Sequence, residues 1–218
     1  MKYGPIFITA TNTDIGKTYA TLKLIESLGK KGLHVGVLKP IETGVVKYPL
    51  DGKLLLDAAK KTNPDLKEFT CRDIVPYQYS LPAAPYVSKG KQKIDLKALH
   101  VTYQKIADVS DIVLIEGAGG LMVPVEKDFY MYDLAKEFKA KILLVTHSNL
   151  GCINDTLLNL KLLDSLHVEY EWCVNMRNME NFALTTLPYY NDRFGRILTL
   201  QNDLEEIIDK FLITDRYM

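Results

Sequence analysis

Residues 6–18 read Ile-Phe-Ile-Thr-Ala-Thr-Asn-Thr-Asp-Ile-Gly-Lys-Thr, and the rest of the chain is organised around this stretch. Residues 6–9 form an apolar, β-branched run that predicts a buried strand. A loop at 10–16 follows, and a helix is predicted from Lys17 onward. This order of strand, loop, Gly-Lys-Thr and helix is typical of a phosphate-binding P-loop, in which backbone N–H groups and the helix dipole attract an anion. Lys17 then reaches the β- and γ-phosphates, and the Thr18 hydroxyl is placed to bind Mg²⁺.

The loop departs from the common spacing Gly-x-x-x-x-Gly-Lys-Thr, which would put a glycine at Thr11. A longer variant of the loop would have its first glycine at Ala10, so the loop must adjust if that position requires a positive φ angle. The alternative is a chance turn between a strand and a helix, and the flanking elements favour the P-loop.

A second signal comes from residues 112–120, Ile-Val-Leu-Ile-Glu-Gly-Ala-Gly-Gly. The first four residues predict a fully buried parallel strand. Glu116 ends this strand, as in the Walker-B arrangement of P-loop proteins, where the carboxylate meets Mg²⁺ directly or through water. The glycines allow the backbone to approach a phosphate closely. A strand followed by a flexible hinge is the alternative, but two independent signals for a magnesium–nucleotide site agree.

The composition indicates a globular enzyme or switch. The 218 residues suffice for one domain, 1–218, with a sizeable core. Lys+Arg and Asp+Glu both number 27, which gives no support for a nucleic-acid or membrane partner. No stretch approaches the ~18–20 apolar residues of a membrane span, and the chain begins without an apolar signal region. The three cysteines lack metal-ligand spacing and are expected to be reduced thiols of a cytoplasmic protein.

Further strands and helices alternate along the chain, which predicts one doubly wound α/β domain with a mostly parallel sheet. Because polar loops follow the strands, they gather at one edge of the sheet, where such folds hold ligands. Strands are predicted at 34–38, 142–146, 169–174 and 197–200, and helices at 17–31, 54–61, 94–108, 132–138, from about 154 to 166, and 203–212.

Several polar residues in these loops have two interpretations. Lys39 is either directed to the P-loop edge or a solvated strand-end lysine. Asp57, within apolar company in a helix that follows an Asp51-Gly52 turn signal, lies either at the wet edge or against a ligand. Asn175 either reads a purine edge or caps the next segment.

Two longer segments are equally open. The irregular, aromatic and proline-rich residues 76–91 are either a lid or substrate wall or an ordinary packed loop. Residues 147–154 lead into a helix whose N-terminus suits a carboxylate. The alternative there is local capping by Asn149 or Asn154.

Taken together, the motifs resemble those of the dethiobiotin synthetases. The lengthened P-loop of that family, Gly-Thr-x-Thr-x-Val-Gly-Lys-Thr, compares with residues 10–18. Its Lys-Pro-x-x-Ser/Thr-Gly, Val-Glu-Gly-Ala-Gly-Gly and Leu-Gly-x-Ile-Asn motifs compare with 39–44, 115–120 and 150–154, and a proline wall is approximated by 82–85. The matches follow the family's order from residue 6 to about 175, and four ordered motifs are more specific than any one.

The resemblance implies a reaction. 7,8-Diaminononanoate takes up CO₂ as a carbamate, the carbamate oxygen attacks the γ-phosphate of ATP, and the second amine attacks the mixed anhydride to close the cyclic urea and release phosphate. It also implies Mg²⁺ and a homodimer in which the partner subunit's loop takes the substrate carboxylate.

The same resemblance implies roles for individual residues. Lys39, Lys17 and Thr13 are expected to be catalytic, and Thr18, Asp57 and Glu116 to hold the metal. The expected nucleotide site comprises Asp14, Ile15, Gly16, Lys17, Thr18, Tyr19, Asp57, Glu116, Gly117, Ala118, Gly119, Asn175 and Pro188, with Pro188 taken as a base-contacting residue. The expected substrate site comprises Thr13, Lys39, Thr43, Leu150, Gly151, Cys152, Ile153 and Asn154. The stretch after Asn175 is shorter than in the family, which leaves purine selectivity open.

Two rival functions are weaker. A regulatory P-loop ATPase of the partitioning or metallochaperone kind usually carries a further lysine at the start of the loop, and residues 10–12 contain none. Some of those proteins also have a basic, membrane-binding C-terminal helix, whereas 203–212 is acidic. An amidotransferase-type synthetase would need an additional glutaminase domain, for which 218 residues leave no room.

Overall fold

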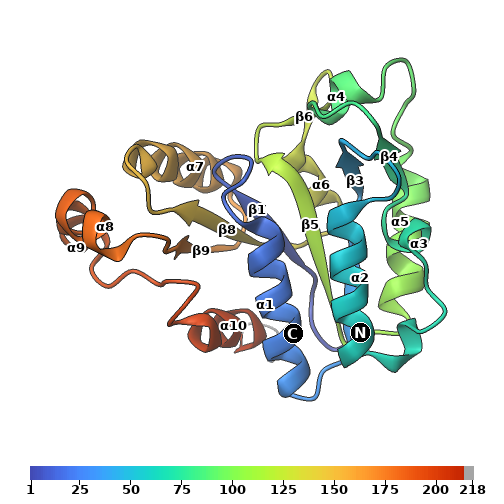
Figure 1. Ribbon diagram of the computed structural model, residues 1–218, viewed down its shortest axis with the longest axis horizontal. Coiled ribbons are helices and arrows are strands. Elements are labelled where there is room, and N and C mark those ends of the chain that lie inside the picture. Colours follow the sequence, from blue (N-terminus) through green and yellow to red (C-terminus); the bar gives the residue numbers. More distant parts are fainter. Residues whose placement is uncertain (214–218) are drawn as a thin grey trace.

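A five-stranded parallel sheet lies at the centre of the computed structural model, which describes residues 1–213 (Figure 1). Its strand order is β2-β5-β1-β8-β9, so the strand before the P-loop is the middle one. The strands β1, β2, β5 and β8 are largely or wholly buried, as expected for a parallel sheet covered on both faces, while the edge strand β9 is buried in its second half. Their bounds are β1 Ile6–Ala10, β2 Val35–Leu38, β5 Ile112–Gly120, β8 Lys141–His147 and β9 Tyr170–Asn175.

Helices cover both faces of this sheet (Figure 1). The helix α1 packs between α2 and α10 on one face, while α5, α6 and α7 contact the strands from the other. The bounds are α1 Lys17–Lys30, α2 Leu50–Thr62, α5 Leu96–Ala107, α6 Met131–Glu137, α7 Cys152–Leu166 and α10 Leu204–Ile213. The three-layer α/β/α fold therefore confirms the predicted doubly wound class.

Short elements complete the described part of the chain. Two small two-stranded sheets, β3–β4 and β6–β7, lie beyond the carboxyl ends of the central strands (Figure 1). The bounds are β3 Ile41–Thr43, β4 Tyr77–Tyr79, β6 Pro124–Glu126, β7 Phe129–Tyr130, the 3₁₀ helix Pro64–Leu66, α3 Cys71–Ile74, α4 Pro85–Ser88, α8 Met179–Thr185 and α9 Leu187–Phe194.

The five long strands were predicted at the correct places, but the sixth, at 197–200, is wrong. There only Thr199 forms an isolated parallel bridge, with Val174. The helices α8 and α9 were not predicted. Both begin in polar, aromatic sequence, and α8 is capped by the Asn178 side chain, which accepts a hydrogen bond from Asn181 N–H.

The helix α2 begins at Leu50, four residues before its predicted start at Leu54. The Asp51-Gly52 pair, predicted as a turn, lies inside its first turn. The reason is a distant side chain, because the Glu42 carboxylate accepts hydrogen bonds from the N–H groups of Asp51 (3.1 Å) and Gly52 (2.9 Å). A carboxylate at a helix N-terminus stabilises the helix through its free N–H groups and its dipole.

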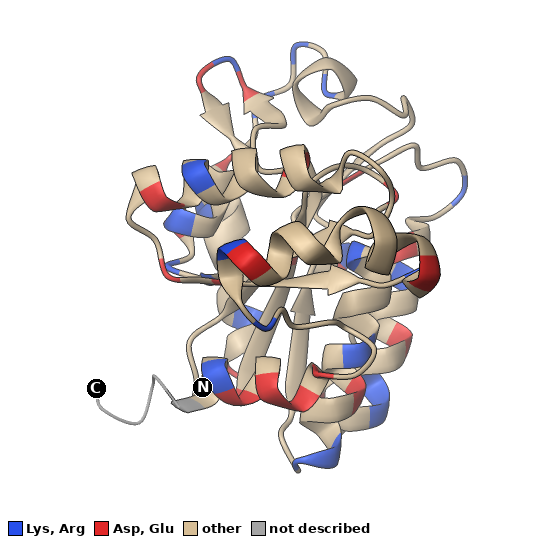
Figure 2. Cartoon of the chain, turned by 90° about the vertical axis from the view of Figure 1, so that its left-hand side faces the viewer, with Lys and Arg blue, Asp and Glu red and all other residues tan. Residues whose placement is uncertain are grey.

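Charged residues of both signs are interleaved along the helices on the side of the molecule that carries α7, α8 and α9 (Figure 2). Among the helices within residues 1–213, none combines the length and the apolar character that crossing a bilayer requires.

Candidate active site

The P-loop connects β1 to α1 in the middle of the sheet's carboxyl edge. Gly16 precedes the helix with a φ of 109°, a left-handed backbone that favours glycine. A Cβ atom at Gly16 would also lie 2.3 Å from Asn175 Nδ2, so space and backbone both require glycine. The first backbone hydrogen bond of α1 joins Ala20 N–H to the Gly16 carbonyl (2.9 Å), which leaves the N–H groups before Ala20 in the turn where no helical carbonyl precedes them. These N–H groups are the ones expected to bind an anion.

Ala10 needs no special backbone. It is the last residue of β1 and is fully buried. The close approach occurs on the neighbouring strand instead, because a Cβ at Gly120 would lie 3.2 Å from the Ala10 carbonyl oxygen. The first glycine of the longer loop variant is therefore not required at position 10.

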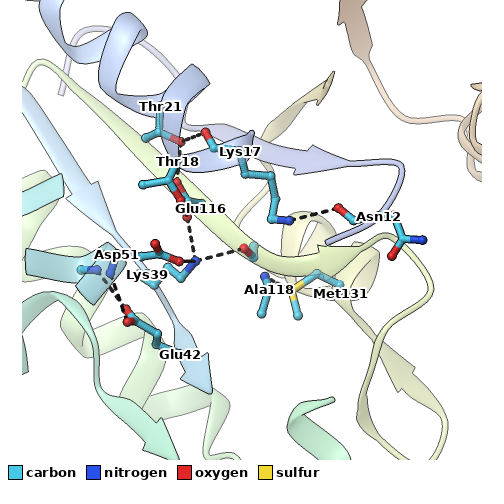
Figure 3. A network of polar contacts seen from close by, with 12 residues as sticks. Asn12, Lys17, Thr18, Thr21, Lys39, Glu42, Asp51, Glu116, Ala118 and Met131 are labelled. Carbon is cyan, nitrogen blue, oxygen red and sulfur yellow. Dashed lines mark hydrogen bonds and ion pairs between the residues drawn. The ribbon is translucent and has the colours of Figure 1, made fainter. Parts of the chain in front are cut away.

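Glu116 is the centre of the polar network (Figure 3). Its side chain is fully buried at the end of the apolar part of β5. Oε1 accepts hydrogen bonds from Thr18 Oγ1 (3.0 Å) and Lys39 Nζ (2.7 Å), and Oε2 accepts one from Thr21 Oγ1 (2.7 Å). The strand continues through Gly120 rather than ending in a flexible hinge, so the carboxylate has a fixed position.

Lys39 is not a solvated strand-end lysine, because only 3% of it is exposed. Its Nζ atom lies 2.7 Å from Glu116 and 3.1 Å from Asp51 Oδ2, and it also donates to the Gly117 carbonyl (3.4 Å). Burial alone would lower the pKa of Lys39, but the carboxylates of Glu116 and Asp51 outweigh it and raise that pKa. The two carboxylates therefore favour the charged form of Lys39.

Lys17 has the opposite tendency. Burial, and then the charge of Lys39, lower its pKa below the usual lysine value. Its Nζ atom donates to the Asn12 carbonyl (3.3 Å) across the loop (Figure 3). The P-loop thus holds an ammonium group that has few favourable partners of its own and would gain from a bound anion.

Glu42 and Asp51 are site residues that the sequence interpretation missed. Glu42 is buried, and its bonds to the start of α2 fix the helix turn that carries Asp51 (Figure 3). Burial raises the pKa of the Glu42 carboxyl, while its hydrogen bonds from backbone N–H groups oppose that shift. The sequence motifs assign no role to the carboxylate of Glu42 or of Asp51. The contact between Glu42 and α2 forms only when the loop between them is folded.

Asp57 is a wrong assignment, and the structure places Asp51 where Asp57 was expected. Asp57 lies on the outer face of α2, its side chain is 54% exposed, and it pairs with Lys53 (2.6 Å). Of the two interpretations of Asp57, the solvent-exposed edge of the helix is therefore the correct one. Asp51, two turns earlier, is the α2 carboxylate that meets Lys39. The error follows from starting the helix four residues late.

A cavity of about 840 Å³ opens between the P-loop, β3 and the loop before α4. This volume lies within the range of about 300–1,000 Å³ that is typical of small-molecule sites. Of the predicted residues, Thr13, Asp14, Gly16, Lys17, Thr18, Lys39, Thr43, Ala118 and Gly119 line it, and Pro82–Pro85 form part of its wall. Further lining comes from Ile41, Glu42, Asp51, Val123 and Arg177.

Asn175 lies beside the P-loop rather than capping the next segment. Its Nδ2 donates to the Ile15 carbonyl (2.7 Å), and its Oδ1 accepts from Gln201 Nε2 (2.7 Å). Ile15 and Asn175 are thus joined at the β9 side of the loop. Gln201 was not predicted as a site residue, because the segment around it matches no motif.

Other predicted residues lie outside the cavity of their own chain. Tyr19 is 43% exposed, and Lys23 Nζ lies over its ring, outside the cavity. Pro188 does not line the cavity and is exposed in the first turn of α9, in the α8–α9 segment beyond β9 (Figure 1), so its role as a base-contacting residue stays a prediction. Residues 150–154, at the start of α7, do not line this chain's cavity, and no side chain caps that helix by a hydrogen bond.

Comparison with known proteins gives close relatives. A family model described as an AAA domain matches residues 5–174. The chain is 45% identical over 190 residues to the ATP-dependent dethiobiotin synthetase BioD of Sulfurovum sp. (strain NBC37-1), covering 87% of this chain and 90% of that protein. It is 38% identical over 212 residues to the protein of the same name from Wolinella succinogenes, covering 95% and 98% of the two chains.

Solved structures share the fold at much lower identity. A plasmid partition protein from Borrelia burgdorferi matches with a TM-score of 0.54 and 14% identity over all of both chains. A ParA family ATPase from Chlorobium tepidum matches with a TM-score of 0.52 and 12% identity over 95% of this chain and 90% of that one. At such identity the likeness concerns the P-loop fold alone.

Proposed function

Because this chain belongs to the ATP-dependent dethiobiotin synthetase family and is thus an ATP-dependent cyclo-ligase of biotin biosynthesis, we propose that its cavity closes the cyclic urea of dethiobiotin. The substrates would be 7,8-diaminononanoate, CO₂ and ATP. The observation that carries this proposal is the buried Lys39, which Glu116 and Asp51 hold charged at the cavity wall beside the P-loop.

The two lysines have complementary places in the proposed reaction. Lys17, in the P-loop, would bind the β- and γ-phosphates, and Lys39, from the neighbouring part of the cavity, would face the carbamate and the transferring phosphoryl group. Negative charge spreads over several oxygens in such a transition state, and fixed cations in a site shielded from water stabilise it strongly. Thr13 and Thr43 also line the cavity and would donate hydrogen bonds to the carbamate or receive them from the amines.

The residues around Lys39 fit a magnesium ion. Thr18, Asp51 and Glu116 offer one hydroxyl and two carboxylates, and each contacts the same network. Within residues 1–213 no three His, Cys, Asp or Glu side chains form a metal-binding group. Mg²⁺ usually takes one or two carboxylates together with phosphates and water. Bound Mg²⁺ would neutralise charge on the phosphate oxygens.

The proposed metal site predicts different outcomes for two aspartates of α2. Asp51→Asn should raise the Mg²⁺ concentration for half-maximal activity at least about 10-fold, because it removes a carboxylate from the network beside Glu116. Asp57→Asn is the matched control and should leave that concentration within about 2-fold, because Asp57 is exposed and bonded to Lys53. Titration of each variant with Mg²⁺ measures both. A larger effect for Asp57 would restore the assignment made from the sequence.

We further propose a homodimer, with the start of α7 contributing to the partner subunit's cavity. Residues 150–154 lie outside the cavity of their own chain, and Leu150 is 83% exposed and Leu158 60% exposed. Contact with a second copy of the chain would remove these two apolar side chains from water, which is favourable. In addition, we propose that residues 1–218 act as one domain and that the protein is cytoplasmic, which agrees with its three free cysteines.

Transfer of an oxygen label tests the proposed chemistry. ¹⁸O-labelled bicarbonate would label both oxygens of the carbamate. The carbamate oxygen that attacks the γ-phosphate stays bonded to phosphorus when the ring closes, and it leaves with the released phosphate. The released phosphate should then carry one ¹⁸O atom, and the dethiobiotin carbonyl should retain another. Mass spectrometry of both products, with the label remaining in bicarbonate as a control for exchange, measures this. Unlabelled phosphate accompanying labelled dethiobiotin would contradict the mixed anhydride.

A further inference from the structure

Arg177 is a cation at the cavity that the proposed reaction has not used. It follows Asn175 at the end of β9, is exposed, and lines the same cavity as Lys17 and Lys39. Its Nη2 atom donates to the Asp14 carbonyl in the P-loop (2.6 Å). The guanidinium therefore lies at the phosphate-binding loop although it comes from a distant part of the sequence.

Hydrogen bonds hold the chain segment from which this side chain extends. Arg177 N–H donates to Ser148 Oγ (2.9 Å), and Ser148 is almost fully buried after β8. Two residues earlier, Asn175 is bonded to Ile15 and Gln201. Such fixed placement reduces the conformational entropy that an arginine loses when it binds a ligand.

Within the part of the chain that the structure describes, no carboxylate balances the charge of Arg177. Within the described residues 1–213, no Asp or Glu oxygen lies within ion-pair distance of its guanidinium. By contrast, Arg196 bonds to both Asp203 and Glu206. An arginine has five N–H donors, of which Arg177 uses one on the Asp14 carbonyl, so the others remain for an anion.

The sheet order indicates which anion this is. The strands β2 and β9 are the two outer strands, and the P-loop follows the middle strand β1. Lys39 follows β2 and faces the part of the cavity assigned to the carbamate, while Arg177 follows β9 on the opposite side. A Cβ at Gly16 would lie 3.9 Å from Arg177 Nη2, which places the guanidinium at the nucleotide end of the loop.

We propose that Arg177 binds the phosphate chain of the nucleotide and closes the P-loop on the side opposite Lys39. The inference rests on ATP use at this site and adds a third cation to Lys17 and Lys39. Guanidinium groups suit this role because their forked N–H donors match phosphate oxygens and they remain charged.

The test compares nucleotides with and without phosphates on the purified full chain. Arg177→Ala should raise the Kd of ATP and of ADP about 10-fold or more in calorimetric titrations, as expected when a hydrogen bond to a charged group is lost. The Kd of adenosine, measured by competition with a fluorescent ATP analogue, should stay within about 2-fold. Arg177→Lys should recover part of the affinity for ATP, and added salt should reduce the difference between wild type and variant.

A matched control is Arg193→Ala, which removes an exposed arginine from α9 that packs over the Phe194 ring. It should leave all three affinities unchanged. The proposal is overturned if Arg177→Ala weakens adenosine and ATP equally, which would mean a role in shaping the base site. It is also overturned if ATP affinity is unchanged, whether or not the KM of the diamine rises. ATP binding by the wild type, measured in the same titration, separates failure of this inference from failure of the proposed function.

Discussion

Lys39→Ala is expected to lower kcat/KM for dethiobiotin formation by about 10³-fold or more, the range found for an arginine that stabilises the charge of a phosphoryl-transfer transition state. The same change should also weaken the fold. It leaves the fully buried Glu116 without its cationic partner, and breaking a buried ion pair costs about 3–5 kcal/mol. Steady-state kinetics and urea denaturation measure the two effects.

Lys53→Ala is the matched control for that experiment, because Lys53 also pairs with an aspartate of α2 but has a half-exposed side chain. Its loss should leave the free energy of unfolding nearly unchanged, because ion pairs between solvent-exposed side chains contribute little to stability. If Lys39→Ala does not fold, Lys39→Arg retains the charge and should fold while remaining slow. Activity of a folded Lys39 variant within 10-fold of wild type would show that Lys39 has a structural role only.

Lys17→Met is expected to have opposite effects on activity and stability. ATP turnover should fall by about 10³-fold, because the lysine that would hold the β- and γ-phosphates is lost. The folded protein should become more stable at pH 7. Burial, and the charge of Lys39, lower the pKa of Lys17 from its ordinary 10.5, so the charged form is disfavoured in the folded state.

The pH dependence follows from the sign of that shift. At a pH below the lowered pKa, Lys17 is charged in both the folded and the unfolded state, and the variant keeps its full advantage. As the pH rises toward 10.5, the folded protein releases this proton first, so the wild type regains stability and the difference shrinks. Urea denaturation at pH 7 and near pH 10 measures this. Lys23→Met, six residues further along α1 and half-exposed, should show neither effect. A loss of stability in Lys17→Met would contradict the account.

The features that could be predicted from the sequence are those carried by contiguous residues. Three such features were found: the strand, loop and helix around the P-loop, the apolar run ending at Glu116, and the lysine after β2. In each of them the functional side chain lies within the stretch of sequence that defines the element. A buried parallel strand must also be apolar, so five strands were found at the correct places. Their carboxyl ends then had to meet at one edge of the sheet.

The residues that were missed depend on contacts between distant segments. Asp51 lies in the site because hydrogen bonds to Glu42 stabilise a first turn of α2 that begins before the predicted start of the helix. No residue near Asp51 in the sequence indicates that turn. Gln201 and Arg177 reach the P-loop through Asn175 and Asp14, at separations that no local pattern reveals. Pro188 was assigned from sequence order alone, and in the structure it lies on α9 and does not line the cavity.

The most direct test of the central claim is the dependence of ATP consumption on the diamine. The purified protein is supplied with ATP, Mg²⁺ and bicarbonate, and phosphate release is measured with and without 7,8-diaminononanoate while dethiobiotin is quantified by mass. The account predicts phosphate release that requires the diamine, with one dethiobiotin formed per phosphate. Phosphate release that is indifferent to the diamine and yields no new product would contradict it and would favour an ATPase switch on the same fold.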